Sequence, residues 1–196
     1  MIQIEFRDNH EETASALRAA FAGLPNVTIV HGDILQGSAD AIVSPANSFG
    51  NMDGGIDLAY ARFFPDGLEE RLQAVVEARF AGELTVGQAT IIPTLHGEIP
   101  LMISAPTMRM PGNIARSVNV YLAFRAALLA LECHRLEAGL EVVTMLSPAM
   151  GTGVGAMPVE RAARQMRTAY DNVLGPRPTR RRNFGVLWGE HLRLLE

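Results

Sequence analysis

Short β-branched runs alternate with segments of helical periodicity along almost the whole chain, and this alternation restricts the fold most. Apolar residues recur every three or four positions in the helical segments, whereas the runs between them are bounded by Gly, Asp or Pro. Strands that alternate with helices favour a largely parallel sheet covered on both faces. We therefore predict a three-layer α/β/α sandwich with a mixed, mostly parallel sheet and helices on both faces. The predicted strands are 2–6, 27–30, 41–43, 90–92, 101–103 and 142–146, and the predicted helices are 11–23, one from about 56, 68–80, 114–137 and 158–174.

The length of 196 residues suits a single domain, which we place at residues 1–174. Its first strand alternates apolar and polar residues, as an edge strand does. Residues 175–183 contain Pro and Arg without periodicity and are predicted to be a linker. It leads to a final short element, 184–195, so that 175–196 form a C-terminal extension that packs on the domain.

The composition excludes several classes of protein. The formal net charge is −4, which argues against nucleic-acid binding by bulk charge. All 17 basic residues are arginine, so a phosphate-binding lysine, a Schiff-base lysine and a Ser–Lys dyad are ruled out. No apolar stretch has the length of a membrane span, and residues 1–25 lack a signal-peptide pattern.

Cysteine and histidine usage gives no indication of a metal site or of a cofactor. The five histidines never fall at metal-ligand spacing. The single cysteine, Cys133, lies in an apolar run, and we expect it to be a small core residue. A chain with one cysteine is typical of a reducing compartment, so we expect the cytoplasm.

Candidate ligand-binding residues follow three of the predicted strands, where open α/β sheets bind their ligands. Asp33 comes after the strand 27–30 and could accept a hydrogen bond from an amino group of a ligand or cap a turn. The loop 44–57 carries three glycines and leads into a helix N-terminus. The loop 148–158 has glycines at alternate positions before another helix. Glycine-rich loops at helix N-termini form cradles for phosphate, so the two loops suggest an elongated diphosphate ligand.

Residues 27–174 resemble a macro domain, the ADP-ribose-binding α/β/α module. Three motifs carry the resemblance, in the order that the family shows. They are Gly32-Asp33-Ile34, then Ala46-Asn47 followed by Gly54-Gly55-Ile56-Asp57, and finally Gly151-Thr152-Gly153-Val154-Gly155.

The resemblance implies a role for each motif. Asp33 would accept a hydrogen bond from the adenine amino group, with the backbone of Ile34 beside it. The remaining ligand-binding residues would be Ala46, Gly54, Gly55 and Ile56 near the diphosphate and distal ribose, and Gly151, Thr152, Gly153, Val154 and Gly155 around the other side of the diphosphate.

The resemblance also implies a catalytic pair. Asn47 and Asp57 keep the spacing of members that remove ADP-ribose from proteins, so Asn47 would fix the distal ribose and Asp57 would orient a water or a hydroxyl. The partner would be ADP-ribose or an ADP-ribosylated protein. In many hydrolases of the family an aromatic residue stands where this chain has Gly155. The alternatives are therefore a non-catalytic ADP-ribose reader and an ADP-ribose 1″-phosphate phosphatase, and Asp57 could simply complement the helix dipole.

Overall fold

The structure is a computed structural model that describes residues 1–65, 67–176 and 183–196. Its centre is a six-stranded sheet in the order β2-β1-β6-β3-β5-β4, in which β4 runs antiparallel to β5 and all other neighbours are parallel. The strands are β1 (Ile2–Asp8), β2 (Val27–His31), β3 (Ala41–Ser44), β4 (Thr90–Pro93), β5 (Leu101–Ser104) and β6 (Val143–Ser147). The helices are α1 (Glu11–Ala20), a 3₁₀ turn η1 (Ile34–Gln36), α2 (Gly55–Phe63), α3 (Leu68–Phe80), α4 (Asn119–Glu137), α5 (Val159–Val173) and α6 (Phe184–Leu195).

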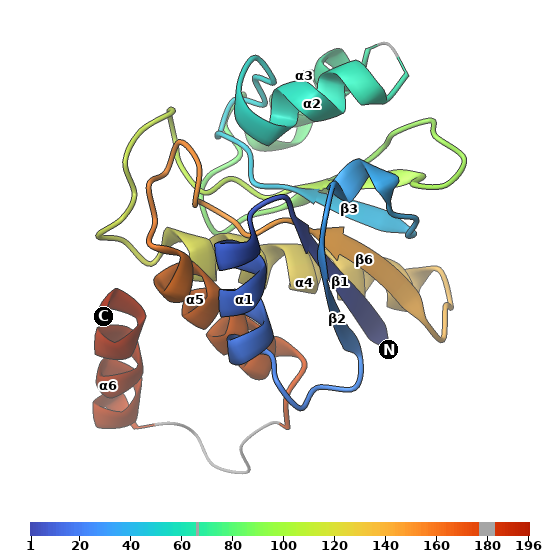
Figure 1. Cartoon of the computed structure of the whole chain (residues 1–196). Coiled ribbons are helices and arrows are strands. Elements are labelled where there is room, and N and C mark those ends of the chain that lie inside the picture. Colours follow the sequence, from blue (N-terminus) through green and yellow to red (C-terminus); the bar gives the residue numbers. More distant parts are fainter. Residues whose placement is uncertain (66, 177–182) are drawn as a thin grey trace.

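Helices cover both faces of the sheet, which confirms the predicted sandwich (Figure 1). One apolar core lies between the sheet and α1, α4 and α5, with Phe6, Phe21 and Phe124 at its centre. The other lies under α2 and α3 and contains Tyr60 and Leu72. Because β1, β2, β3, β5 and β6 run parallel, their carboxyl ends lie at one rim of the sheet. The loops that follow these strands meet at this rim.

The expectation that the first strand is an edge strand is wrong. Strand β1 lies inside the sheet, and Ile4 is in register with Val27 of β2 on one side and with Met145 of β6 on the other. Its apolar residues Ile2 and Ile4 are buried under the helices, whereas Gln3 on the opposite face is exposed. The alternation therefore indicates that one face of this strand is exposed to solvent. It does not indicate how many neighbouring strands β1 has.

Two further expectations need correction. The helix predicted over 114–137 begins only at Asn119, because the N–H of Ile114 donates to the carbonyl of Gly155 at 2.8 Å and Ser117 forms a turn that precedes the helix. Cys133 is exposed on α4, so it is not a core residue.

The C-terminal helix α6 lies against α5 (Figure 1). Leu194 is its one buried residue, and Phe184, Leu187 and Trp188 are exposed. Most of the predicted linker, residues 177–182, lies outside the described residues. No helix in the described part of the chain is both long and apolar enough to cross a membrane.

Candidate functional site

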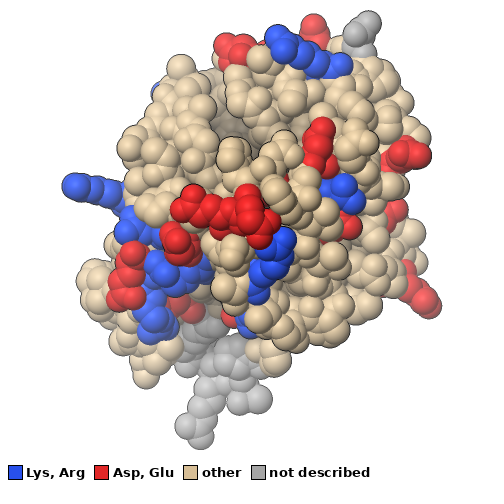
Figure 2. Space-filling model, viewed as in Figure 1, with Lys and Arg blue, Asp and Glu red and all other residues tan. Residues whose placement is uncertain are grey.

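A pocket of about 430 Å³ opens at the rim where the parallel strands end. Figure 2 shows this face hollowed, with mostly uncharged side chains beside the hollow and charged groups both above and below it. The loops after β1, β3, β5 and β6 all contribute to the lining. The lining includes Ala46, Asn47, Gly54, Gly55, Ile56, Asp57, Gly151, Thr152, Gly153, Val154 and Gly155, so eleven of the thirteen predicted site residues meet in one cavity.

The first glycine loop shapes the pocket through the start of α2. Gly54 precedes the helix, and Gly55 opens it with φ of +57°, a conformation that favours glycine. A β-carbon at either position would meet no atom within 4 Å. The backbone N–H groups of the first helical turn have no partners within the helix, so this loop offers donors to an anion.

Asp57 is the buried acid of the pocket. It lies in the first turn of α2, where its Oδ1 accepts a hydrogen bond of 2.6 Å from the hydroxyl of Ser44 on β3. Its exposed fraction is only 7 %, and burial raises the pKa of Asp57 to about 6, although the bond from Ser44 acts in the opposite direction. Oδ2 has no hydrogen-bond partner among the described residues. A carboxylate with a pKa near neutrality can accept and return a proton at physiological pH.

Asn47 lines the pocket, but its amide group is occupied by the loop itself. Its Oδ1 accepts from the N–H groups of Phe49 and Asn51 at 3.0 and 3.3 Å, and its Nδ2 donates to the carbonyl of Asn51 at 2.7 Å. These bonds fold the chain into the turn that precedes Gly54 and Gly55. The side chain therefore shapes the loop first, and a bond to a ribose would have to share or replace one of these contacts.

The glycines of the second loop differ in how much space surrounds them. Gly151 has φ of +76°, and a β-carbon there would lie 2.7 Å from the side chain of Val120. At Gly155 a β-carbon would lie 2.5 Å from the carbonyl oxygen of Gly151 and 2.8 Å from Ile114. Gly153 faces open space. An aromatic side chain therefore has no room at Gly155 in this loop conformation.

Asp33 and Ile34 lie beside a smaller cavity of about 280 Å³. It shares Asp8, His10, Ile56 and Pro148 with the main pocket, so the two form one elongated depression. The Oδ1 of Asp33 accepts from the N–H of Leu35 at 3.0 Å and caps η1. The carboxylate thus caps a turn, which is one of the two roles expected for it, and Asp33 also lines the second cavity.

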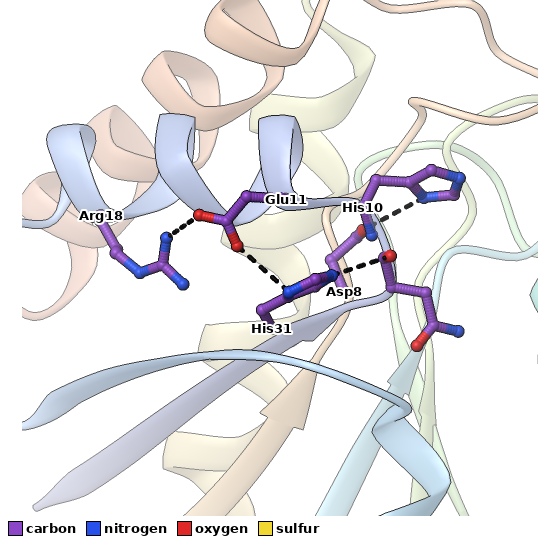
Figure 3. A network of polar contacts seen from close by, with 6 residues as sticks. Asp8, His10, Glu11, Arg18 and His31 are labelled. Atoms are coloured by element: carbon purple, nitrogen blue, oxygen red, sulfur yellow. Dashed lines mark hydrogen bonds and ion pairs between the residues drawn. The ribbon is translucent and has the colours of Figure 1, made fainter.

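Asp8 and His10 are site residues that sequence reasoning missed. Asp8 ends β1, and its Oδ1 accepts from the N–H of His10 at 2.9 Å and lies 3.1 Å from the ring Nδ1 (Figure 3). Behind them, Glu11 contacts both Arg18 and His31. An Asp-x-His sequence just after a predicted strand is a usable signal, but the family resemblance begins at residue 27 and leaves this segment out.

The charges around the main pocket limit what can bind a phosphate there. No arginine lines it within the described residues, whereas Asp8, Asp53 and Asp57 do. A diphosphate would therefore be held by backbone N–H groups and helix N-termini. The described parts of the chain contain no group of three His, Cys, Asp or Glu side chains that could hold a metal ion.

Comparisons with known proteins agree with this architecture. The macro domain family model matches residues 43–166, and the chain belongs to this family. An uncharacterized protein of Aeropyrum pernix is 39% identical over 149 residues, which cover 75% of this chain and 71% of that protein. An O-acetyl-ADP-ribose deacetylase of Enterobacter cloacae is 32% identical over 139 residues, 71% of this chain and 73% of the enzyme.

Solved structures show the same fold at lower identity. A mutant macrodomain of Oceanobacillus iheyensis, solved with ADPR, superposes with a TM-score of 0.63 at 20% identity, over 75% of this chain and 77% of that one. The DarG macrodomain of Mycobacterium tuberculosis superposes with a TM-score of 0.54 at 24% identity, over 71% and 86% of the two chains.

Proposed function

We propose that this protein binds ADP-ribose along the rim of the sheet and hydrolyses ADP-ribosyl esters. One observation carries the proposal: both glycine loops and the buried residue Asp57 line one and the same pocket. The connected smaller cavity beside Asp33 would take the adenine. The family and the deacetylase among the relatives support this assignment.

The chemistry follows from the environment of Asp57. Ester hydrolysis needs a water whose proton is removed as its oxygen attacks, and Asp57 with a pKa of about 6 is ionised at pH 7 and basic enough to take that proton. The ester C–O bond then breaks, and the leaving oxygen takes up a proton from solvent. Gly54, Gly55 and the loop 151–155 would hold the diphosphate and so fix the distal ribose against Asp57.

A non-catalytic reader is the second candidate, and two observations favour it. The amide of Asn47 is engaged within its own loop, and Gly155 has no room for an aromatic side chain. Either feature would weaken control of the distal ribose. Binding would survive both.

Two measurements separate the candidates. Titration calorimetry with ADP-ribose tests binding, and incubation with aspartyl- or glutamyl-linked mono-ADP-ribosylated protein and with O-acetyl-ADP-ribose tests turnover by release of free ADP-ribose. Binding with release supports the hydrolase. Binding without release from either substrate supports the reader, and absence of binding overturns both.

A further inference from the structure

The C-terminal helix α6 is fastened to the domain at its last turn. The final carbonyl groups of a helix have no partners within it, and here three side chains of α5 supply donors. Arg164 Nε donates to the carbonyl of Arg193 at 3.1 Å, and Gln165 Nε2 donates to that of Leu194 at 2.8 Å. Arg161 Nη2 donates to the backbone oxygen of Glu196, the residue that follows α6, at 2.8 Å.

Two of these three side chains also hold the loop 113–118. Arg161 Nη1 donates to the carbonyl of Ala115, and Gln165 Nε2 donates to the carbonyl of Ser117 at 2.8 Å. Gln165 is completely buried, and its Oε1 accepts from the N–H of Tyr121 at 3.0 Å. Every donor and acceptor of its amide is thereby used except one lone pair, so its position is fixed from three sides.

The loop 113–118 in turn supports the second glycine loop. The N–H of Ile114 donates to the carbonyl of Gly155 at 2.8 Å. The side chain of Ile114 also fills the space beside Gly151 and Gly155, where β-carbons would approach it to 3.0 and 2.8 Å. The shape of the loop 151–155 therefore depends on where Ile114 lies.

We propose that α6 is a clamp for the loop 151–155, acting through Arg161 and Gln165. These two are positioning residues: they tie the last turn of α6 to the loop 113–118, which places Ile114 under Gly155. The choice of ADP-ribose as the ligand rests on the proposed function. Loosening the clamp should weaken binding of the diphosphate part of the ligand and leave binding of the nucleoside part almost unchanged.

The test compares variants of the full chain. Arg161→Met and Gln165→Met remove bonds to both α6 and the loop 113–118, whereas the matched control Arg164→Met removes a bond to α6 alone. Leu194→Glu places a charge at the buried contact of α6 and leaves the loop untouched. Thermal melting confirms that each variant is folded.

The first readout needs no ligand. Amide hydrogen exchange at Ile114 reports its bond to Gly155, and we expect faster exchange in Arg161→Met, Gln165→Met and Leu194→Glu than in the wild type. Arg164→Met should give a smaller increase, because it leaves two of the three bonds to the end of α6 in place. Unchanged exchange in both clamp variants overturns the proposal. Unchanged exchange in Leu194→Glu alone would show that α6 does not act on the loop 113–118. Arg161 and Gln165 would then have only a local role, which also contradicts the clamp.

The second readout compares two ligands. The affinity for ADP-ribose should fall about threefold to tenfold in the clamp variants, as expected for the loss of one or two hydrogen bonds, and the affinity for adenosine should change by less than about twofold. Equal losses for both ligands contradict a role at the diphosphate. If the wild type binds neither ligand, the proposed function fails, and the exchange rates of Ile114 still decide whether the clamp exists.

Discussion

The hydroxyl of Ser44 donates a 2.6 Å hydrogen bond to Oδ1 of Asp57, and both residues are buried at the point where β3 and α2 meet. Asp57 lowers the stability of the fold when it ionises, because a carboxylate that is removed from water costs free energy. The hydrogen bond from Ser44 partly offsets that cost. The pair therefore links the stability of the fold to the chemistry of the pocket.

Asp57→Asn should stabilise the protein at pH 8. The pKa of Asp57 rises from its ordinary value of 3.8 to about 6 on folding, so the folded state binds a proton more tightly and stability falls as pH rises through this interval. The isosteric amide escapes this cost, which amounts to about 2–3 kcal/mol above pH 6. Urea unfolding should show the gain at pH 8 and little of it below about pH 4. The matched control is the same substitution at the exposed neighbour, Asp53→Asn.

Ser44→Ala should move the acidic limb of the pH profile of ester hydrolysis to higher pH. The bond from Ser44 lowers the pKa of Asp57, so its loss raises that pKa further. The quantity to follow is kcat/KM for O-acetyl-ADP-ribose between pH 5 and 8. Activity should decline as pH falls through the pKa of Asp57 in the wild type, and it should decline earlier in the variant. If Ser44→Ala leaves the pH profile of kcat/KM unchanged, Asp57 is not the titrating base.

Asn47→Ala should lower both thermal stability and ADP-ribose affinity. Three hydrogen bonds from its amide fold the loop 47–51, each worth about 0.5–1.5 kcal/mol. A residue that acted only on the distal ribose in the transition state would lower the release rate alone. Scanning calorimetry and titration of the same variant distinguish the two. A normal melting temperature with normal affinity would restore a purely catalytic role.

Asp33→Ala should reduce the preference for adenine. A carboxylate accepts from the adenine amino group and repels the carbonyl oxygen of hypoxanthine, and a bond to a charged group is worth about 1.5–3 kcal/mol, or roughly 10- to 150-fold in affinity. Titrations with ADP-ribose and its inosine analogue should differ on the wild type and converge on the variant. Identical curves on the wild type would leave Asp33 as the cap of η1 alone.

Two glycines of one loop should respond in opposite ways to substitution. Gly153→Glu should fold normally, because a β-carbon there meets no atom within 4 Å, and should lose ADP-ribose binding by repulsion of the diphosphate. Gly155→Ala should lower the melting temperature, since its β-carbon would lie 2.5 Å from the carbonyl oxygen of Gly151. Melting curves and titrations of the two variants provide the comparison. Unimpaired binding by Gly153→Glu would mean that the diphosphate lies elsewhere.

Sequence reasoning captured the layers of the fold and the loops of the pocket because both depend on local signals. Periodicity marks helices and strands, and glycines before a helix mark an anion cradle. The prediction that β1 is an edge strand was wrong, because alternation indicates which face of a strand is exposed to solvent and not which strands lie beside it. Asp8 and His10 were missed because the family resemblance covers only residues 27–174. The bond between Ser44 and Asp57 could not be read either, because it joins residues thirteen positions apart through tertiary packing.

The interior position of β1 has a consequence for where this protein can be cut. The family model covers 43–166, yet the strand that fills the gap between β2 and β6 is the first segment of the chain. A fragment trimmed to the recognised region would leave β6 with an open flank and would uncover the apolar surface that α1 protects. During synthesis β1 can pair early with β2, whereas its pairing with β6 has to wait until residues 143–147 have been made. We therefore expect a fragment limited to residues 43–166 to be less stable than the full chain, because it lacks β1, α1 and β2.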